Sequence, residues 1–257
     1  MPEIAGKYLN TDGFQPGVNT ASMLYEAFKN KINPNGVAAF VHATSYADDR
    51  QVMQYLSDYF HTRGIDTIFA APDHLKWVGR KAVSIIEGKK CDITGIIRFF
   101  PLEWLISLPK GADWTGYYDC EIPSCNHPVA IFAQSKRLPL IWDKLNIEIP
   151  AWRKLLPETK DPKSVTPQDK EWLYKPALGR VGEGITFRDE KLEKIIRRYS
   201  TDWIAQQMFK SQPLESYHLC VGVFTVNGKR AGFYGRVSPY SVIDSRAKDI
   251  PILIGRD

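Results

Sequence analysis

Apolar and polar positions in the first part of the chain follow patterns typical of alternating strands and helices. Residues 37–42 form a short apolar run rich in β-forming side chains, and they follow a turn signal at residues 33–36. Apolar residues recur at helical spacing over residues 48–60, and Gly64 ends that pattern before a second β-rich run at residues 67–70. A strand, a helix and a strand in this order favour parallel pairing of the two strands around a crossover helix.

Beyond this unit the pattern becomes less regular. A third strand is predicted at residues 93–98, and Pro101 can occupy the first turn of a helix. Residues 111–128 show no regular period, and a helix is predicted over residues 135–145. Four prolines interleaved with charged residues then indicate a loop or linker and a domain boundary: Pro150, Pro157, Pro162 and Pro167.

The second half of the chain combines helix and strand patterns with a hairpin signal. A strand, a helix and a strand are predicted at residues 172–174, 190–198 and 203–205. Residues 219–225 and 231–237 then flank an Asn-Gly pair at residues 227–228, which is the strongest short signal for a β-hairpin. The predicted fold class is therefore α/β in the first half and α+β, with an antiparallel sheet, in the second.

The composition limits the domain size and the classes of partner that the chain is expected to have. With 257 residues, 44% hydrophobic and 25% charged, the chain can bury a core as one large domain or two small ones. The net charge of +5 is spread along the sequence, which argues against a nucleic-acid partner. No apolar run is long enough to cross a bilayer, so no membrane partner is expected. The four cysteines form no Cys-x-x-Cys pair, so we expect free thiols and a cytoplasmic location.

A glycine-rich segment at residues 175–185 carries the clearest chemical signal. Its three glycines, Gly179, Gly182 and Gly184, permit close approach of the backbone, whose N–H groups can then point at phosphate oxygens. Lys175 and Arg180 add positive charge at the same place. The spacing matches neither a P-loop nor a dinucleotide fingerprint. A tight hairpin with surface charges is the alternative interpretation.

Several segments, in their order and content, resemble glutathionylspermidine synthase and related acid–amine ligases. Residues 175–185 are similar to the glycine-containing grasp loop of that family, and residues 134–136 resemble the segment that supplies its first ATP lysine. The other similar segments lie at residues 10–12 with 24–28, at 48–50, at 100–104, at 204–207 and at 235–243.

The resemblance implies an ATP-grasp-like fold and an ATP-dependent reaction. Residues 1–128 would form a pre-ATP-grasp-like α/β part with the substrate-contact segments, and residues 129–257 the nucleotide-binding part. In such ligases a substrate carboxylate attacks the γ-phosphate of ATP, and an amine displaces phosphate from the acyl phosphate to form a C–N bond. The substrates implied are a small acid of the thiol-peptide type and an amine, and Mg²⁺ is the implied cofactor beside ATP.

The same resemblance implies roles for individual residues. Arg236 would be catalytic by stabilising charge at the phosphates. Asn10 and Asp12 would bind the metal, and Asp49, Arg50, Glu103 and Trp104 would contact substrate. The residues implied for ATP binding are Lys136, Lys175, Gly179, Arg180, Gly182, Gly184, Gln206, Gln207, Met208, Ser241, Val242 and Ile243.

Most of these side chains have an ordinary structural alternative. Arg236 could be a surface arginine of a strand. Glu103 could belong to an amphipathic helix, and the neighbouring aromatic residues could be core. Asp49 could serve as a carboxylate at a helix amino terminus. No function is assigned to His42.

The segment before Asn10 departs from the family pattern. Tyr8 stands two residues before Asn10, and a neutral phenol cannot replace an anionic oxygen ligand of Mg²⁺. Three functions therefore stay open: a working ligase, a nucleotide-binding protein or fragment without ligase turnover, and an interaction module on the same fold.

We expect turnover far below that of complete relatives, because Tyr8 replaces a metal-binding carboxylate. Phosphate release measured with candidate thiol peptides and amines, for the wild type, Tyr8→Glu and Arg236→Ala, tests this. A wild-type rate on the order of 1 s⁻¹, which is within the ordinary enzyme range, would show that another group supplies the ligand. A further drop in Tyr8→Glu would then contradict the placement of the metal site at this end of the chain.

Overall fold

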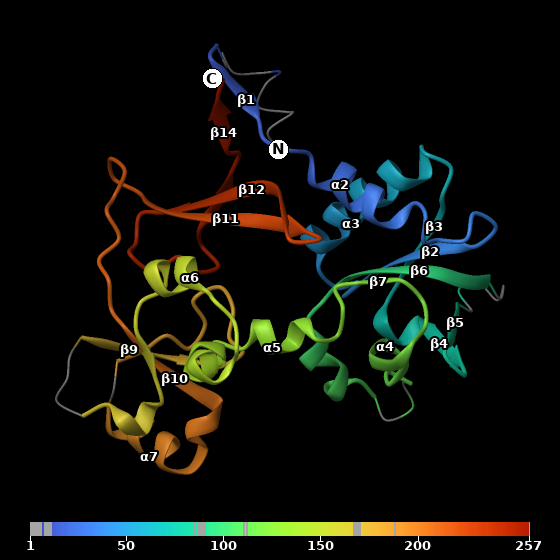
Figure 1. Ribbon diagram of the computed structural model, residues 1–257. Helices are drawn as coiled ribbons and strands as arrows, with labels where there is room; N and C mark the ends of the chain where they lie inside the picture. The colour runs from blue at the N-terminus through green and yellow to red at the C-terminus, as the bar shows by residue number, and fades with distance from the viewer. Residues whose placement is uncertain are drawn as a thin grey trace. The chain divides into compact units, whose positions relative to one another are not determined.

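The computed structural model describes residues 7, 12–84, 86, 91–109, 111, 113–166, 171–187 and 189–256. The chain divides into two compact units (Figure 1). We call residues 18–131 with 223–232 the α/β unit, and residues 1–17, 132–222 and 233–257 the antiparallel unit. The assignment of residues 1–128 and 129–257 to substrate and nucleotide parts remains a prediction.

A mixed sheet forms the centre of the α/β unit. Its strands lie in the order β3-β2-β6-β5-β4, with β7 beside β6. β2 pairs in parallel with both β3 and β6, whereas β4, β5 and β6 pair antiparallel. The bounds are β2 Val37–His42, β3 Asp66–Ala70, β4 Leu75–Val78, β5 Lys81–Ser84, β6 Cys91–Phe99 and β7 Ser124–Cys125. The predicted parallel strand–helix–strand unit and the third strand are confirmed, while the β4–β5 hairpin was not predicted.

Two hydrophobic clusters cover the two faces of this sheet. Because successive side chains of a strand point to opposite faces, Phe40 of β2 belongs to one cluster and Val41 to the other. Helices α2 (Thr20–Phe28) and α3 (Ala47–His61) cover the Phe40 face. The opposite face packs against the 3₁₀ helix Leu102–Ser107 and the short helix α4 (Gly116–Asp119). β2 is thus buried on both sides, which explains its continuous apolar sequence.

A three-stranded antiparallel sheet with one helix organises the antiparallel unit. The strands are β8 (Thr159–Lys160), β9 (Trp172–Pro176) and β10 (Trp203–Gln207), in the order β8-β10-β9. Helix α7 (Glu190–Tyr199) packs on one face through Leu192 and Ile196 against Trp172, Tyr174 and Ala205. The helix begins at Asp189, whose side chain accepts a hydrogen bond from the Leu192 amide at 2.7 Å. The predicted strand, helix and strand of this region are confirmed.

The predicted hairpin is also present. β11 (His218–Val226) and β12 (Lys229–Ser238) are joined by Asn227 and Gly228, with φ angles of 50° and 73°. Positive φ at both central residues is the signature of a type I′ turn, which Asn-Gly favours. β12 also pairs with β13 (Lys248–Ile250), and β1 (Phe14–Pro16) pairs with β14 (Leu253–Gly255).

Two predictions for residues 135–167 are wrong. The helix predicted over residues 135–145 is instead α5 (Ala130–Gln134) followed by a 3₁₀ helix, Leu138–Lys144. Pro139 explains the break, because it lacks an N–H and fits only the first turn of a helix. Residues 150–164 are no linker, since they form α6 (Pro150–Leu155), β8 and a 3₁₀ helix, Pro162–Ser164. Pro150 and Pro162 start helices there, and Pro167 lies outside the described residues.

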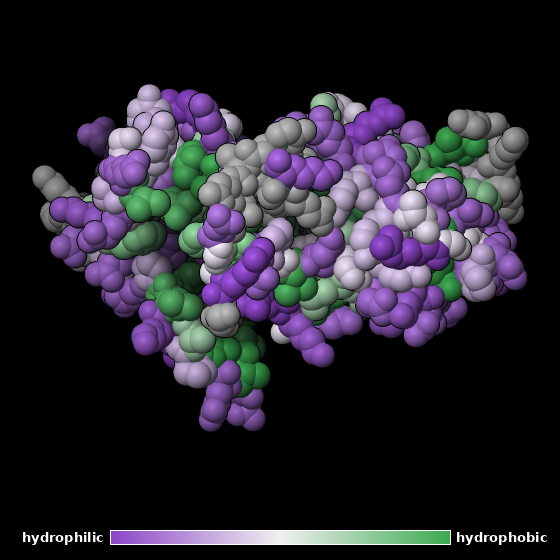
Figure 2. All heavy atoms as spheres, turned by 90° about the horizontal axis from the view of Figure 1, so that it is seen from above, coloured by the Kyte–Doolittle hydropathy of each residue, from purple (hydrophilic) through white to green (hydrophobic). Residues whose placement is uncertain are grey.

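Hydrophilic side chains cover most of the face drawn in Figure 2, and hydrophobic ones form smaller separate patches on it. Within the described ranges, no helix is both long enough and apolar enough to pass through a membrane.

The buried Phe40 side chain gives a stability test of the α/β unit. It has 0% exposure, and its ring meets that of Phe60 edge-on at 5.4 Å. We expect Phe40→Ala to lower the free energy of unfolding by about 3–5 kcal/mol, because it leaves a cavity. Val78→Ala, at a side chain with 59% exposure in the same unit, should change it by less than about 0.5 kcal/mol. Equal losses in urea titrations of the two variants would contradict this core.

Candidate functional site

The glycine-rich loop, residues 177–185, leaves β9 and returns to it. The amide of Tyr174 donates to the Thr186 carbonyl at 2.8 Å, and the Thr186 amide donates back at 3.0 Å. At the start of the loop the Ala177 amide donates to the Asp202 carbonyl at 2.7 Å. The loop is therefore anchored at its start to the residue just before β10 and at its end to β9.

The middle of the loop requires glycine for two reasons. Gly182 has a φ of 74° and Gly184 one of 67°, a region that other residues rarely adopt. A Cβ on Gly182 would lie 3.2 Å from Val242 Cγ1 and 3.3 Å from the Ile243 carbonyl oxygen. The fold thus brings the glycine-rich loop against residues 242–244, two segments that the sequence analysis had assigned separately to the nucleotide.

Ser241, Val242 and Ile243 lie in a loop, and not in the final sheet expected from the resemblance. β12 ends at Ser238, and Arg236 of that strand holds the loop that follows. Arg236 Nε donates to Asp249 Oδ1 at 3.1 Å, and its Nη2 donates to the carbonyl oxygens of Asp244 (3.1 Å) and Ala247 (3.3 Å). The guanidinium of this predicted catalytic residue therefore fixes the loop beside Gly182 in this structure, and its catalytic role remains a prediction.

Lys136 reaches the glycine-rich loop from a different segment. Its backbone amide donates to the Ala177 carbonyl at 2.9 Å, and its ammonium donates to the carbonyls of Pro176 (3.2 Å) and Gly179. The adjacent Arg137 explains this placement, although the sequence analysis gave it no role. Arg137 donates to the carbonyls of Ser200 and Trp203 at 3.0 and 2.8 Å, and so ties the segment to the start of β10.

Lys175 lies on the face of the sheet opposite α7. It is paired in register with Ile204, and its ammonium donates to Gln206 Oε1 at 2.7 Å. Burial lowers the pKa of Lys175 because the surroundings solvate the charged form poorly. Gln206 Nε2 in turn donates to Thr159 Oγ1 of β8 at 3.0 Å. Thr159 is a member of this site that the sequence analysis missed.

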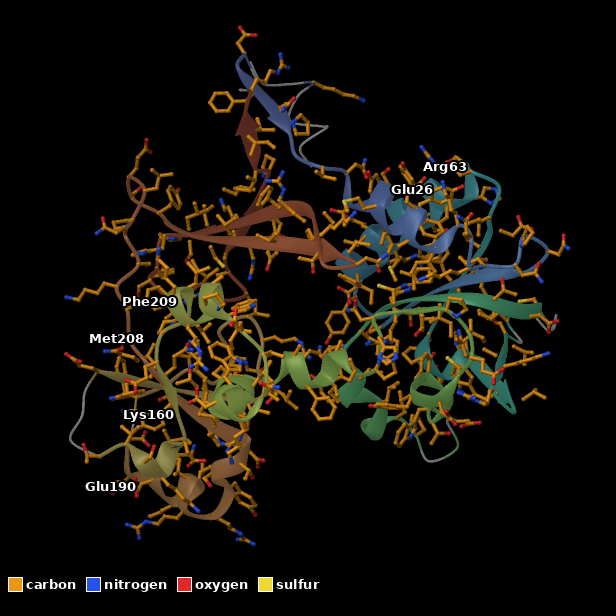
Figure 3. All side chains as sticks on the ribbon, viewed as in Figure 1. Glu26, Arg63, Lys160, Glu190, Met208 and Phe209 are labelled. Carbon is orange, nitrogen blue, oxygen red and sulfur yellow. The ribbon has the colours of Figure 1, made fainter. Side chains whose placement is uncertain are left out.

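Gln207, the last residue of β10, and Met208, the residue after it, already have backbone partners. The Gln207 amide donates to the Glu158 carbonyl at 2.8 Å, and the Met208 amide to the Glu171 carbonyl at 2.6 Å. An adenine contact through these two N–H groups would have to replace those bonds. Met208 and Phe209 leave the sheet here (Figure 3), and Phe209 is 66% exposed.

The predicted substrate segments lie in the α/β unit, at the carboxyl ends of parallel strands. Asp49 and Arg50 are in the first turn of α3, which follows β2, and Glu103 and Trp104 are in the 3₁₀ helix that follows β6. β2 and β6 end side by side, and the rings of Tyr46 and Trp104, 6.3 Å apart, connect the two segments. Carboxyl edges of parallel strands are where ligands bind in open α/β sheets.

Burial and a neighbouring histidine influence the pKa of Asp49 at this edge of the sheet. Burial raises the pKa of Asp49, and its proximity to His42 partly opposes that rise. His42 is only 1% exposed, and its Nε2 has no hydrogen-bond partner among the described residues. The sequence analysis assigned His42 no function. The signal was a histidine that ends an otherwise apolar strand, six residues before a pair of aspartates.

A cavity of about 470 Å³ lies elsewhere in the α/β unit. It is lined by α2, by residues 117–128 and by the turn at residues 225–227. None of Asp49, Arg50, Glu103 and Trp104 lines it. The predicted substrate residues and this cavity are therefore separate features.

The predicted metal ligands are described only in part. Asn10 lies outside the described residues, and Asp12 is an exposed residue just before β1. Among the residues that the structure describes, no group of three or more His, Cys, Asp or Glu side chains could hold a metal ion. The magnesium site at Asn10 and Asp12 remains a prediction.

Comparisons with known proteins agree with the ATP-grasp-like fold. The family model described as glutathionylspermidine synthase preATP-grasp matches residues 18–255. The chain is similar to the apo structure of a glutathione synthetase-like effector from Globodera pallida, with a TM-score of 0.50 and 14% identity. That match covers 90% of this chain and 60% of the effector chain, so the chain spans little more than half of that relative.

A second solved structure, that of D-cycloserine synthetase, matches with a TM-score of 0.47 and 14% identity, over 86% of this chain and 75% of the other. No curated protein matches the chain. At 14% identity the likeness to the effector concerns the fold alone. Together with the family match, it confirms the predicted fold class of mixed α/β with antiparallel sheets.

Amide hydrogen exchange tests the backbone hydrogen bonds of the glycine-rich loop. The amides of Ala177 and Thr186 donate backbone hydrogen bonds and should exchange slowly. Among the described residues, the amides of Gly182 and Gly184 donate no backbone hydrogen bond, so they should exchange fast without nucleotide and slow down with ATP. Hydrogen exchange with mass spectrometry measures this. Strong protection of both glycines without nucleotide would indicate a rigid structural hairpin instead.

Proposed function

Because the chain belongs to the glutathionylspermidine synthase pre-ATP-grasp family, we propose that it acts as an ATP-dependent acid–amine ligase. It would join a small acid of the thiol-peptide type to an amine. The antiparallel unit would bind the nucleotide, and the segments around Asp49 and Glu103 in the α/β unit would contact the substrates.

The observation that carries this proposal is the convergence of two lysines on the glycine-rich loop. Lys136 contacts the first part of the loop through the carbonyls of Pro176 and Gly179. Lys175 is the last residue but one of β9, the strand from which the loop departs. Two compact positive charges from separate segments, beside a loop with Arg180 and flexible glycines, fit the charge and size of a polyphosphate.

The loop backbone also fits phosphate. Gly182 and Gly184 adopt positive φ, and a Cβ at Gly182 would enter the narrow space against residues 242–244. Turns of this kind present successive N–H groups to an anion. The amides of both glycines are not engaged in backbone hydrogen bonds with described residues. Adenine would be contacted through Gln206, Gln207 and Met208.

In the proposed reaction, the acid carboxylate attacks the γ-phosphorus and the bond to the β-phosphate oxygen breaks, giving an acyl phosphate and ADP. The amine nitrogen then attacks the acyl carbon, phosphate leaves, and the nitrogen loses a proton. Lys136 and Lys175 would hold the phosphates and offset their negative charge. Arg236 would add to this effect only after exchanging some of its carbonyl partners for phosphate oxygens.

The substrate segments offer charges of both signs. An amine is protonated at neutral pH, so the carboxylates of Asp49 and Glu103 suit the amine substrate. Arg50 would pair with a carboxylate of the acid. Mg²⁺ would be expected with ATP, with Asn10 and Asp12 as its protein ligands, and no step is assigned to it.

Lys175→Met tests the nucleotide site. We expect it to weaken ATP binding by about 1.5–3 kcal/mol, because a charge-assisted contact is lost while the apolar stem is kept. Lys160→Met is the matched control, since Lys160 (Figure 3) is on the same sheet but lies over the Trp172 ring, on the α7 side. Calorimetric titration with ATP, with and without Mg²⁺, measures both.

Equal weakening in the two variants would mean that charge in general, and not this site, attracts ATP. If the wild type binds no ATP under either condition, the proposed function is wrong.

A further inference from the structure

Three hydrogen bonds beside the proposed nucleotide site form a chain that leads from Lys175 to Pro157. The ammonium of Lys175 donates to Gln206 Oε1 at 2.7 Å, and Gln206 Nε2 donates to Thr159 Oγ1 at 3.0 Å. Thr159 Oγ1 then donates to the Pro157 carbonyl oxygen at 3.2 Å. We call this set the Thr159 relay.

Both ends of the relay have fixed polarity. A carbonyl oxygen can only accept, so the single hydroxyl proton of Thr159 is committed to Pro157. Thr159 Oγ1 must then accept from its other neighbour, which requires the NH₂ group of Gln206 to face it. An ammonium can only donate, so Lys175 requires the oxygen of the same amide. Both conditions select one of the two orientations of the Gln206 amide.

The relay depends on the position of β8. Thr159 is paired in register with Gln206, so the two side chains lie on the same face of the sheet. Lys175 lies on that face as well, while Tyr174 beside it enters the core against α7. The two-residue strand β8 thereby places the Thr159 hydroxyl beside the Gln206 amide.

The relay opposes the effect of burial on the pKa of Lys175. Burial lowers the pKa of Lys175 because it disfavours the charged form of the ammonium. The Gln206 oxygen is the polar atom that stabilises the charged form. If the amide turned over, its NH₂ group would face the ammonium, and two donors would oppose each other.

We propose that Thr159 is a positioning residue of the nucleotide site, which fixes the Gln206 amide so that its oxygen holds the Lys175 ammonium charged and in place. The inference rests on the proposed function, in which that ammonium contacts a phosphate of ATP. Thr159 itself touches no reacting atom.

Thr159→Val tests the relay because it keeps the shape and removes the hydroxyl. ATP binding should weaken about tenfold, which is the loss typical of one buried polar contact. Thr159→Ser keeps the hydroxyl and should bind ATP within about twofold of the wild type. A threonine needed only for packing would give the opposite order, since serine loses the methyl group that valine keeps.

The pH dependence separates positioning from packing. Without a fixed oxygen partner the pKa of Lys175 falls further, so ATP binding should be lost at a lower pH in Thr159→Val than in the wild type. In a Gln206→Met background, Thr159→Val should have no further effect, because the link to Lys175 is already missing. Additive losses with an unchanged pH profile would overturn the proposal.

A measurement without nucleotide separates this inference from the proposed function. An acylating reagent reacts only with the neutral amine of a lysine. The rate at which each lysine is modified, measured by mass spectrometry at several pH values, therefore follows its fraction of neutral amine. Thr159→Val should move the Lys175 profile to lower pH and leave that of Lys160 unchanged. If the wild type binds no ATP but this shift occurs, the relay holds and the proposed function fails. An unmoved Lys175 profile overturns the relay whether or not ATP binds.

Discussion

The register of β9 against β10 places the candidate nucleotide site. With Lys175 opposite Ile204, the residues Trp172, Tyr174 and Ala205 face α7 and form the core, while Lys175 and Gln206 share the other face. A slip of one residue would exchange the two faces and bury the lysine in the core. The hydrophobic core thus fixes the register, and the register in turn fixes the polar face from which the glycine-rich loop departs.

Three cations around this loop donate to neutral oxygens of the protein. Lys136 donates to loop carbonyls, Lys175 to a side-chain amide, and Arg236 to two carbonyls besides Asp249. A phosphate oxygen carries negative charge, so it attracts an ammonium or guanidinium more strongly than a neutral carbonyl or amide oxygen does. A polyphosphate can therefore compete for these groups, and the contacts that now shape the loop would be the ones to rearrange when nucleotide binds.

The α/β unit offers a different environment for the proposed substrates. At one edge of its sheet Asp49 lies near a buried histidine, His42, and the Glu103 segment follows β6 at the same edge. The aspartates at the start of α3 also complement the helix dipole, as their structural interpretation holds. The two roles are compatible, because carboxylates at the first turn of a helix remain near the end of the preceding strand. The separate cavity beside α2 takes no part in the proposed reaction.

The sequence alone determined those features that depend on neighbours along the chain. Periodicity gave the strand–helix–strand unit around β2, and the Asn227-Gly228 pair gave the hairpin, because both are local preferences of the backbone. The residues expected at the site came from short segments similar to a known family, and their roles remain predictions.

Only the tertiary structure decided which of these segments meet. It brought Gly182 against Val242, turned Arg236 onto its own loop, and set Thr159 beside Gln206, 47 residues away in sequence. β8 has two residues, too few for any hydrophobic period, so no local pattern could have revealed it. Contacts of this kind depend on strand pairing and register, which the packing of distant side chains determines and no single segment encodes.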